Sequence, residues 1–496
     1  MTAAYLGIDC GTQGTKAIVV DEHGKTLGTG RAAHALIERS SGAREQDPAW
    51  WVGAMREAMS SALANGLAAD VRAIAVSGQQ HGLVVLDESL EVIRPAKLWN
   101  DTETAPENAE LIERLGGEAA CLERYGIVLR TGYTVSKLLW LAKHEPDNFA
   151  RIRHILLPHE YLNFWLTDQL KAERGDASGT GYFDVRTLTW ATDVLDLIDG
   201  GTGQLSAALP DLVSPNESVG KIRPEVALEF GLPANCVVAV GGGDNMMGAI
   251  GTGNLREGVV TLSLGTSGTV YSYRSAPPED KTGCVAPFCA SSGGWMPLVC
   301  TMNATNVVTQ TLALLHKTVE DIDPALANTD PGADGLTLIP FLNGERTPDL
   351  PSARGSLIGI STTNFTADHM IRASVEGVSF GLLDGLGLIV GNAQTDRVRL
   401  IGGGSRSAGW RQLLADATGA TIEVPIEQEA GCLGAAMQAA CLDATLSGQD
   451  VTLEKFAETW VRLDETRTTL PDRSKAASYS AAISRYRETL RSLYQV

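Results

Sequence analysis

Apolar runs rich in β-branched residues alternate along the chain with longer amphipathic stretches. Five of these runs indicate strands, namely AIVVD (17–21), RAIAVSG (72–78), CVVAVGGG (236–243), VVTLSLG (259–265) and DRVRLIGGG (396–404). Two stretches have the apolar spacing of helices, PAWWVGAMREAMSSALANGL (48–67) and SAGWRQLLADATG (407–419). Strands that are apolar throughout are typical of sheets covered on both faces. The alternation therefore predicts an α/β fold.

A weak internal repeat indicates how the chain is divided. The blocks LGIDCGTQGTKAIVVDEHGKTLG (6–28) and VVTLSLGTSGTVYSYRSA (259–276) each contain a strand, a Gly-Thr-x-Gly-Thr turn and a second strand. A duplicated domain and a chance likeness of two hairpins both explain this. A chain of 496 residues is long for a single core, which favours two domains. We expect domains at 1–250 and 251–496, and an amphipathic helix at 474–495 whose packing the sequence does not assign.

Charge and cysteine usage narrow the class of protein. The formal net charge of −19 argues against a nucleic-acid or anionic-membrane partner, because such partners need a basic surface. The eight cysteines are scattered, without a CxxC pair, as expected for free thiols in a reducing compartment. We find no signal-like N-terminus and no apolar segment of the length needed to cross a bilayer. A soluble, cytoplasmic protein is expected, with the oligomeric state left open, a homodimer included.

Asp9 ends the first predicted strand, directly before the turn that contains Gly11 and Thr12. A carboxylate at the carboxyl end of a strand in an open α/β sheet points to where ligands bind. Such a group suits Mg²⁺, which takes carboxylate and phosphate oxygens. A turn-capping aspartate is the alternative. The segment GTQGTK does not match the Walker A loop.

A second carboxylate, Asp244, follows three glycines in AVGGGDNMMGA (239–249). The residues alone leave three roles open, namely a turn residue after a strand, a metal ligand and a proton acceptor. The two methionines that follow are expected to fill the core.

Neutral polar groups cluster in SGQQHGLVVLD (77–87) and KLWNDTET (97–104). The amide of Gln80 and the imidazole of His81 suit hydroxyl groups better than phosphate. The ring of Trp99, with Asn100 and Asp101 beside it, is typical of a sugar site. A loop histidine with internal partners and a core-anchoring tryptophan are the alternatives, and His159 and Glu160 are expected to be structural.

A third glycine-rich element, IGGGSRSAGW (401–410), lies between a strand and a helix that Ser405 or Ser407 would cap. Glycines at this position let a nucleotide lie against the backbone. Structural packing of the turn explains the glycines equally well.

Together, DCGTQGT, GQQHG, WND, GGGDN, LSLGTSGT and IGGGSRS resemble the FGGY carbohydrate kinases, and among them the xylulokinases most closely. GYTVSKLLWL (132–141) and RGSLIGISTTNFTADHMIRASVEG (354–377) are similar to the two signatures of that family, and DASGTGYFDVRTLTW (176–190) is also xylulokinase-like. The resemblance covers residues 5–445. It implies two ribonuclease H-like, actin-like ATPase domains around a central cleft, with ATP and Mg²⁺ as cofactors.

The resemblance also implies roles for individual residues. Asp244 corresponds to the catalytic base and Asp9 to a phosphate and Mg²⁺ element, while Asn245 becomes a candidate sugar contact beside Gln80 and His81. Many bacterial xylulokinases have methionine where this chain has Gln80, and an amide at this position changes how sugar hydroxyls are paired. The remaining nucleotide-binding positions are Gly11, Thr12, Gly265, Thr266, Ser267, Gly402, Gly403 and Gly404.

The implied reaction is ATP-dependent phosphorylation of a ketopentose, D-xylulose before others, to give the 5-phosphate. Ribulose, gluconate and glycerol are alternative substrates of the same enzyme class, although GQQHG and WND offer no cation for gluconate. A non-kinase actin-like ATPase, or a catalytically inactive sugar sensor, is the rival from another class. The partner in every kinase alternative is a small molecule.

Overall fold

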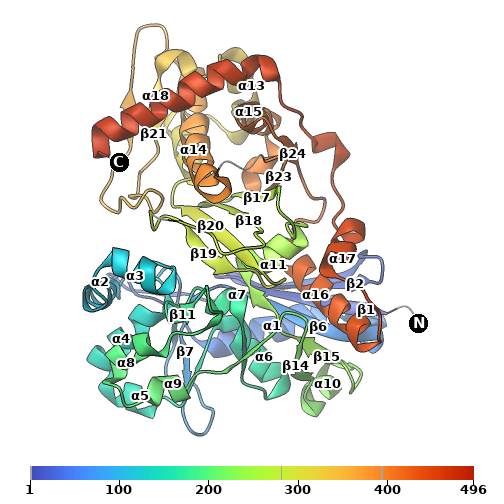
Figure 1. The fold of residues 1–496 in the computed structure, drawn as a ribbon. Coiled ribbons are helices and arrows are strands. Elements are labelled where there is room, and N and C mark those ends of the chain that lie inside the picture. Colours follow the sequence, from blue (N-terminus) through green and yellow to red (C-terminus); the bar gives the residue numbers. More distant parts are fainter. Residues whose placement is uncertain (1–2, 281, 392–394, 496) are drawn as a thin grey trace. The chain divides into compact units, whose positions relative to one another are not determined.

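The structure is a computed structural model that describes residues 3–280, 282–391 and 395–495. The chain forms two compact units (Figure 1). Unit 1 comprises Met1–Leu255, Arg274–Met296 and Glu429–Val461, and unit 2 comprises Arg256–Tyr273, Pro297–Gln428 and Arg462–Val496. Both units are discontinuous, whereas we expected contiguous halves that meet near residue 250.

Unit 1 is built on a mixed sheet with the strand order β14-β15-β6-β1-β2-β3, and β16 also pairs with β6. Its strands are β1 (Ala4–Cys10), β2 (Gly14–Asp21), β3 (Thr26–Ala33), β6 (Val71–Gly78), β14 (Ser218–Lys221), β15 (Val237–Ala239) and β16 (Gly242–Gly243). The helices of unit 1 that matter below are α1 (Pro48–Ala62), α4 (Thr134–His144), α6 (Pro158–Thr167), α7 (Arg174–Ala177), α11 (Asp244–Gly251), α16 (Ala430–Leu446) and α17 (Leu453–Trp460).

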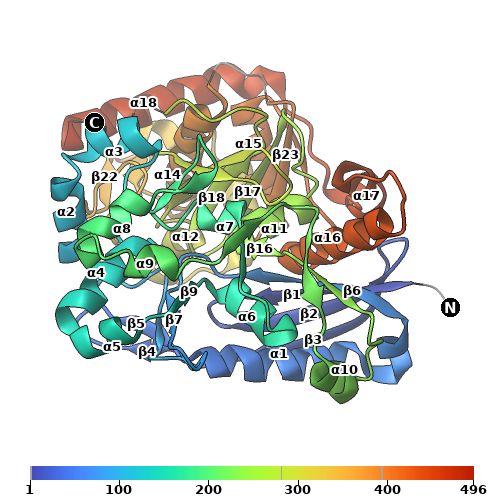
Figure 2. The same cartoon turned by 60° about the horizontal axis from the view of Figure 1, so that its bottom comes forward.

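Helices cover both faces of this sheet (Figure 2). Alternate residues of a strand point to opposite faces. On β1, Leu6 and Ile8 pack in the core that contains α1, whereas Tyr5 packs in the core that contains α11 and α16. The same alternation places Asp9 on the α16 face. The distant segment 429–461 joins unit 1 because α16 packs against β1 and β6.

Unit 2 contains strands in the order β20-β18-β17-β23-β24. The strands are β17 (Val259–Leu264), β18 (Gly268–Ser272), β20 (Trp295–Thr301, its last five residues in this unit), β23 (Arg397–Ile401) and β24 (Thr421–Glu423). Helices α12 (Thr305–Leu314), α13 (Ile322–Asn328), α14 (Ala367–Val390) and α15 (Ala408–Thr418) accompany them. All five strand runs and both helical stretches expected from the sequence are present as elements of these types.

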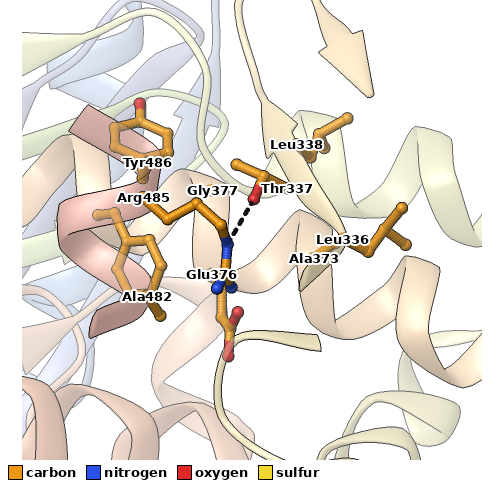
Figure 3. A pocket seen from close by; sticks show the side chains of 10 residues that line it. Leu336, Thr337, Leu338, Ala373, Glu376, Gly377, Ala482, Arg485 and Tyr486 are labelled. Carbon is orange, nitrogen blue, oxygen red and sulfur yellow. Dashed lines mark hydrogen bonds between the residues drawn. The ribbon is translucent and has the colours of Figure 1, made fainter. Parts of the chain in front are cut away.

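The C-terminal helix α18 (Ala476–Tyr494) packs on unit 2, against α14, α15 and β21 (Thr337–Ile339). Figure 3 shows the small pocket at this contact, where the Arg485 guanidinium donates a 3.2 Å hydrogen bond to the Thr337 hydroxyl. Glu376 of α14 lines the same pocket and accepts a hydrogen bond from Arg372. The sequence did not assign this packing.

The length of helix α14 corrects the expectation that no apolar segment is long enough to cross a bilayer. By length and composition it is apolar enough to cross a membrane, and no other helix among the described residues is. In the structure 78% of the most apolar 18-residue part of this helix is buried, so the helix is a core element of unit 2.

Candidate active site

Three strand ends lie side by side in unit 1. Strands β1 and β6 are parallel, with Asp9 opposite Ser77, and β16 is parallel to β6, with Gly243 opposite Gly78. Because the carboxyl ends of parallel strands meet at one edge of a sheet, the residues that follow these strands are brought together. The segment after β6 contains Gln80 and His81, and the helix after β16 begins at Asp244.

Asp9 lies at the end of β1 with its carboxylate held in place. Its Oδ1 accepts a 2.6 Å hydrogen bond from the Ser77 hydroxyl. Burial raises the pKa of Asp9, while Ser77 and the charge of Lys16 offset part of this rise. Lys16 is on the neighbouring strand β2, opposite Asp9, and forms a 2.5 Å ion pair with Glu429.

Asp244 is the first residue of α11, where the partial positive charge of a helix N-terminus favours a carboxylate. Its Oδ1 accepts hydrogen bonds from the Asn245 backbone amide at 2.7 Å and from Asn245 Nδ2 at 2.9 Å. Burial raises the pKa of Asp244 to about 7, and the negative charges of Asp9 and Asp176 add to the rise. A carboxylate with this pKa is suited to accept a proton near neutral pH.

The side chain of Gln80 reaches this helix. Its Oε1 accepts a 2.9 Å hydrogen bond from Asn245 Nδ2, the same atom that donates to Asp244. Gln80 is buried, whereas Asp244 and Asn245 are partly exposed. An amide chain therefore links the segment after β6 to the candidate base.

His81 has an unusual backbone that its neighbours hold in place. Its φ is +65°, a left-handed conformation that is uncommon outside glycine. Its carbonyl oxygen accepts hydrogen bonds from Lys137 Nζ at 2.5 Å and from the Thr134 hydroxyl at 3.2 Å. The imidazole packs in a cluster with the rings of Tyr133 and Phe288, with centroids 4.9 Å and 5.7 Å away. The ring position is therefore fixed by packing.

Lys137 belongs to the GYTVSKLLWL motif on α4 and is fully buried. Besides the His81 carbonyl, its ammonium group binds the Gly132 carbonyl at 2.7 Å. Burial lowers the pKa of Lys137 to about 7. This lysine acts on the site through the backbone of His81.

Trp99 and Asn100 contribute to the same region of unit 1. The indole N–H of Trp99 donates a 2.9 Å hydrogen bond to the hydroxyl of Thr12, in the turn after β1. Asn100 Oδ1 is buried and has no hydrogen-bond partner among the described residues. Since a buried acceptor without a donor is costly, this atom is a candidate to meet a ligand hydroxyl.

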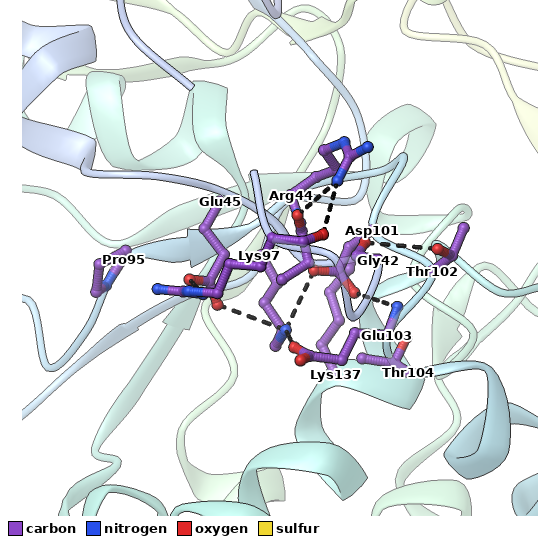
Figure 4. Close-up of polar contacts among 12 residues, drawn as sticks. Gly42, Arg44, Glu45, Pro95, Lys97, Asp101, Thr102, Glu103, Thr104 and Lys137 are labelled. Carbon is purple, nitrogen blue, oxygen red and sulfur yellow. Dashed lines mark hydrogen bonds and ion pairs between the residues drawn. The ribbon is translucent and has the colours of Figure 1, made fainter. Parts of the chain in front are cut away.

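Asp101 differs from its two neighbours because protein groups occupy its carboxylate. It is fully buried, and it accepts hydrogen bonds from the backbone amides of Arg44 and Glu103 at 2.9 Å and 3.1 Å. Lys97 Nζ lies 3.1 Å from its Oδ2 and also pairs with Glu45 and Glu103 (Figure 4). This geometry favours a supporting role for Asp101 over direct contact with a sugar.

In unit 2, two glycine-rich segments follow the carboxyl ends of two neighbouring parallel strands, as the candidate residues do in unit 1. Residues 265–267 make the turn between β17 and β18, and residues 402–404 follow β23, which is parallel to β17. Gly402 has φ +87°, and a Cβ there would lie 2.5 Å from the Leu264 carbonyl oxygen, so only glycine fits. Ser407 caps α15 by accepting a hydrogen bond from the Trp410 backbone amide. The structure thus selects Ser407 over Ser405 as the cap.

The sequence does not single out three residues around this site, namely Ser77, Lys137 and Asp176. For Ser77, the available signal is its position at the end of the strand next to that of Asp9. His159, which the sequence predicts to be structural, is fully buried, and its Nδ1 lies 2.8 Å from Asp176 Oδ2.

No group of three or more His, Cys, Asp or Glu side chains that could hold a metal occurs in the described parts of the chain. Asp9 by itself offers hard oxygen atoms, which fits a cation that takes most of its ligands from phosphate and water. The eight cysteines are all free, as expected.

Comparison with known proteins covers nearly the whole chain. Residues 4–251 match the N-terminal domain, and residues 260–442 the C-terminal domain, of the FGGY family of carbohydrate kinases. The chain is 46% identical over 498 residues to the xylulose kinase of Haemophilus influenzae, which covers 99% of this chain and 100% of the relative. It is 40% identical to the xylulose kinase of Streptomyces rubiginosus, with 90% and 88% covered.

Solved structures agree with this result. The crystal structure of a xyloylose kinase from Brucella ovis has a TM-score of 0.91 at 32% identity and covers 99% of both chains. The xylulose kinase of Bifidobacterium adolescentis has a TM-score of 0.83, also at 32% identity, with 97% of this chain and 99% of that chain covered. These matches confirm the expected two-domain, actin-like α/β fold. The chain belongs to the FGGY family of carbohydrate kinases.

Proposed function

We propose that the chain transfers the γ-phosphoryl group of ATP to a hydroxyl of D-xylulose, with Asp244 as the general base. Family membership makes the chain a sugar kinase that uses ATP. Full-length relatives named xylulose kinase support the ketopentose as acceptor. The observation that carries the proposed mechanism is Asp244, a carboxylate at a strand edge with a pKa of about 7 that burial has raised.

Phosphoryl transfer asks the protein mainly for positioning and charge stabilisation. In the proposed step the hydroxyl oxygen bonds to the γ-phosphorus as the bond to the leaving ADP breaks. The hydroxyl proton passes to Asp244, which accepts it late because a sugar hydroxyl is a weak acid. General-base catalysis of this kind contributes roughly 10²–10⁴-fold.

Asp9 is the proposed Mg²⁺ ligand. When bound, Mg²⁺ would neutralise charge on the phosphate oxygens. The carboxylate suits this role because Ser77 orients one of its oxygens and Lys16 limits its tendency to protonate. Its negative charge also helps to keep the pKa of Asp244 high.

The proposed sugar-binding groups are Gln80, His81, Trp99, Asn100 and Asn245. They are neutral donors and acceptors with one aromatic face, which suits a polyhydroxylated, uncharged ligand. The unpartnered Asn100 Oδ1 supports a ligand hydroxyl at this position. We assign Asp101 to the support of this group.

The proposed nucleotide-binding elements are the turn with Gly11 and Thr12 in unit 1, and residues 265–267 and 402–404 in unit 2. Backbone amides in such turns can approach phosphate oxygens closely. The position of each turn at the end of a strand supports this proposed role.

Two buried lysines bear on the gluconate alternative. A carboxylate substrate would need a cation with free donors. Lys137 donates two of its three N–H bonds to backbone carbonyls, and its pKa, which burial lowers to about 7, makes it a weak cation at neutral pH. Lys97 is paired with three carboxylates. The site therefore favours a neutral sugar over gluconate.

The net charge of −19 supports the absence of a nucleic-acid or anionic-membrane partner. A cytoplasmic location follows from the reaction, because ATP is a cytosolic substrate. A homodimer is compatible with the sequence, and its presence is a question for size measurement in solution.

A coupled assay of ADP release across pentuloses, hexuloses, gluconate and glycerol tests the substrate. We expect the highest kcat/KM with D-xylulose, and a higher value with gluconate or glycerol would overturn the assignment. Asp244→Asn should retain sugar binding by calorimetry and lose at least about 100-fold in kcat. Turnover near that of the parent protein would remove Asp244 from the role of base. No ADP release with any sugar would favour the actin-like ATPase alternative.

A further inference from the structure

A buried pair of charged groups lies behind the amide of Gln80. His159 Nδ1 is 2.8 Å from Asp176 Oδ2, and neither side chain is exposed. Because a carboxylate only accepts, His159 must donate through Nδ1. Burial by itself would lower the pKa of His159, but the hydrogen bond and charge of Asp176 raise it. The two side chains thus form a charge-assisted hydrogen bond inside unit 1.

The backbone around Asp176 is also fixed. Asp176 is in the short helix α7, which Glu173 caps by accepting hydrogen bonds from the amides of Gly175 at 2.6 Å and Asp176 at 2.5 Å. Asp176 therefore has a rigid backbone on one side and His159 on the other. Its second oxygen, Oδ1, is buried and is left without a hydrogen-bond partner among the described residues.

Gln80 is the group that faces this second oxygen. Gln80 and the His81 backbone amide lower the pKa of Asp176, which offsets part of the rise that burial causes. Gln80 Nε2, a donor, and Asp176 Oδ1, an acceptor, are both buried, and neither has a hydrogen-bond partner among the described residues. Since Asp176 can only accept, it requires Gln80 to turn its NH₂ group inward and its carbonyl oxygen toward α11.

The orientation of Gln80 then decides the orientation of Asn245. The Gln80 carbonyl oxygen accepts from Asn245 Nδ2 at 2.9 Å, and the same NH₂ group donates to Asp244 Oδ1 at 2.9 Å. Both N–H bonds of Asn245 are used in this arrangement. Its remaining polar atom, Oδ1, is an acceptor and can receive a hydrogen bond from a ligand hydroxyl.

We propose that Asp176, held by His159, is a positioning residue that fixes the polarity of the Gln80–Asn245 amide chain. The chain then presents an N–H to the base Asp244 and a carbonyl oxygen to a hydroxyl of the sugar. The inference rests on the proposed function and extends it to two residues that do not contact the sugar themselves.

Replacing the Asp176 carboxylate by an amide removes the group that fixes the direction of the Gln80–Asn245 amide chain. In Asp176→Asn the new side chain can offer either an oxygen or an NH₂ group to Gln80, so the amide chain can reverse. A reversed Asn245 would place its oxygen against the Asp244 carboxylate. We expect the KM for D-xylulose to rise and kcat/KM to fall at least about tenfold, the factor that corresponds to 1.4 kcal/mol. The KM for ATP should be unchanged.

A second substitution tests polarity itself. In the double variant Gln80→Glu with Asp176→Asn, the new carboxylate at position 80 accepts from both neighbouring amides and restores the direction at Asn245. We expect this double variant to recover at least about tenfold in kcat/KM over Asp176→Asn alone. Gln80→Glu alone places a second carboxylate against that of Asp176. We expect its kcat/KM to be lower than that of Asp176→Asn alone. An equal or lower activity of the double variant would overturn the proposal.

The variant Gln80→Met distinguishes a positioning role of Asp176 from a purely structural role. It adds no charge, so this test holds even where the variants with Gln80→Glu fail to fold. In Gln80→Met the amide chain is interrupted by a side chain of similar volume, so Asp176→Asn should add no further change in sugar affinity. Calorimetric titration of D-xylulose without ATP measures this affinity, and thermal melts confirm folding. If Asp176→Asn costs as much affinity with methionine at position 80 as with glutamine, the proposal is wrong.

The exposed Asp196→Asn on helix α8 (Thr192–Asp199) is the matched control, and its kinetics should equal those of the parent protein. The parent protein also separates the two hypotheses. A parent that phosphorylates no sugar refutes the proposed function. A parent that phosphorylates D-xylulose, with an Asp176→Asn variant of unchanged KM and kcat, refutes only the positioning role.

Discussion

Gly431 of α16 faces the carboxylate of Asp9 at close range. A Cβ built on Gly431 would lie 2.9 Å from Asp9 Cγ and 3.0 Å from Asp9 Oδ1. Real Cβ atoms do not approach other atoms this closely, so a side chain at this position would displace the carboxylate. A shift of the Asp9 carboxylate would strain its 2.6 Å hydrogen bond from Ser77. The absence of a side chain at Gly431 therefore fixes where the proposed Mg²⁺ ligand sits.

Gly431→Ala should lower kcat at least about tenfold, because misplacement of a catalytic group by about 1 Å can cost about 100-fold. Stability should change little, since alanine favours the helix by about 1 kcal/mol over glycine. Gly53→Ala in α1, where a Cβ meets nothing within 4 Å, is the control and should keep full activity. The two variants are compared by kcat and by thermal melting. An unchanged kcat in Gly431→Ala would contradict the proposed role of Asp9.

A second glycine shapes the sugar side. A Cβ on Gly179 would lie 2.2 Å from Cε1 of His81, so the His81 ring, which packs against Tyr133 and Phe288, would have to shift. Gly179→Ala should therefore raise the KM for D-xylulose about tenfold, a cost of about 1.4 kcal/mol in binding. The KM for ATP should be unaffected. Initial-rate kinetics with each substrate varied in turn measure both values, and a rise confined to the KM for ATP would refute this place for the sugar.

The strand-end positions of Asp9, His81 and Asp244 could be predicted because each lies near the end of an apolar run and close to glycines in the sequence. The edge of the sheet then brings them together. Lys137 could not be found in this way, because a lysine in an amphipathic helix is ordinarily exposed. The contact of His159 with Asp176 depends on tertiary packing between α6 and α7, which periodicity does not encode. For the same reason the sequence did not place the segment 429–461 in unit 1.

Lys137→Met should destabilise unit 1 and weaken sugar binding together. The substitution leaves the Gly132 carbonyl oxygen without the Lys137 donor and the His81 carbonyl oxygen with the Thr134 hydroxyl as its remaining side-chain donor. An unsatisfied buried group costs about 1–3 kcal/mol, so we expect a loss of at least about 2 kcal/mol in the free energy of unfolding. Denaturant melts measure this loss. Lys143→Met on the same helix is the control, and because Lys143 is partly exposed its loss should stay below about 1 kcal/mol. Equal losses in the two variants would contradict the role given to Lys137.

The pKa of Asp244 predicts the acidic limb of the pH profile. Burial and the charges of Asp9 and Asp176 raise this pKa from 3.8 to about 7. The base must be deprotonated to accept the hydroxyl proton, so activity falls as pH decreases through the pKa. We expect kcat/KM for D-xylulose to fall about tenfold per pH unit below pH 7, as for a single essential base. A profile that stays flat down to pH 5.5 would show that Asp244 ionises normally or is not the base.

Glu160 gives a pH-dependent stability that can be separated from catalysis. Burial raises its pKa from 4.5 to about 8, and its Oε2 accepts a 2.7 Å hydrogen bond from the Leu157 backbone amide. The folded state therefore holds a proton that the unfolded state releases, and this contribution is full below pH 4.5 and is lost as pH rises through 8. Glu160→Gln imitates the protonated acid and does not titrate. Its Tm relative to the parent protein should rise by at least about 2 °C between pH 5 and pH 8.5. The exposed Glu113→Gln on helix α2 (Ala105–Arg114) should show no such trend, and a constant difference for Glu160→Gln would mean that Glu160 is ionised in the folded protein.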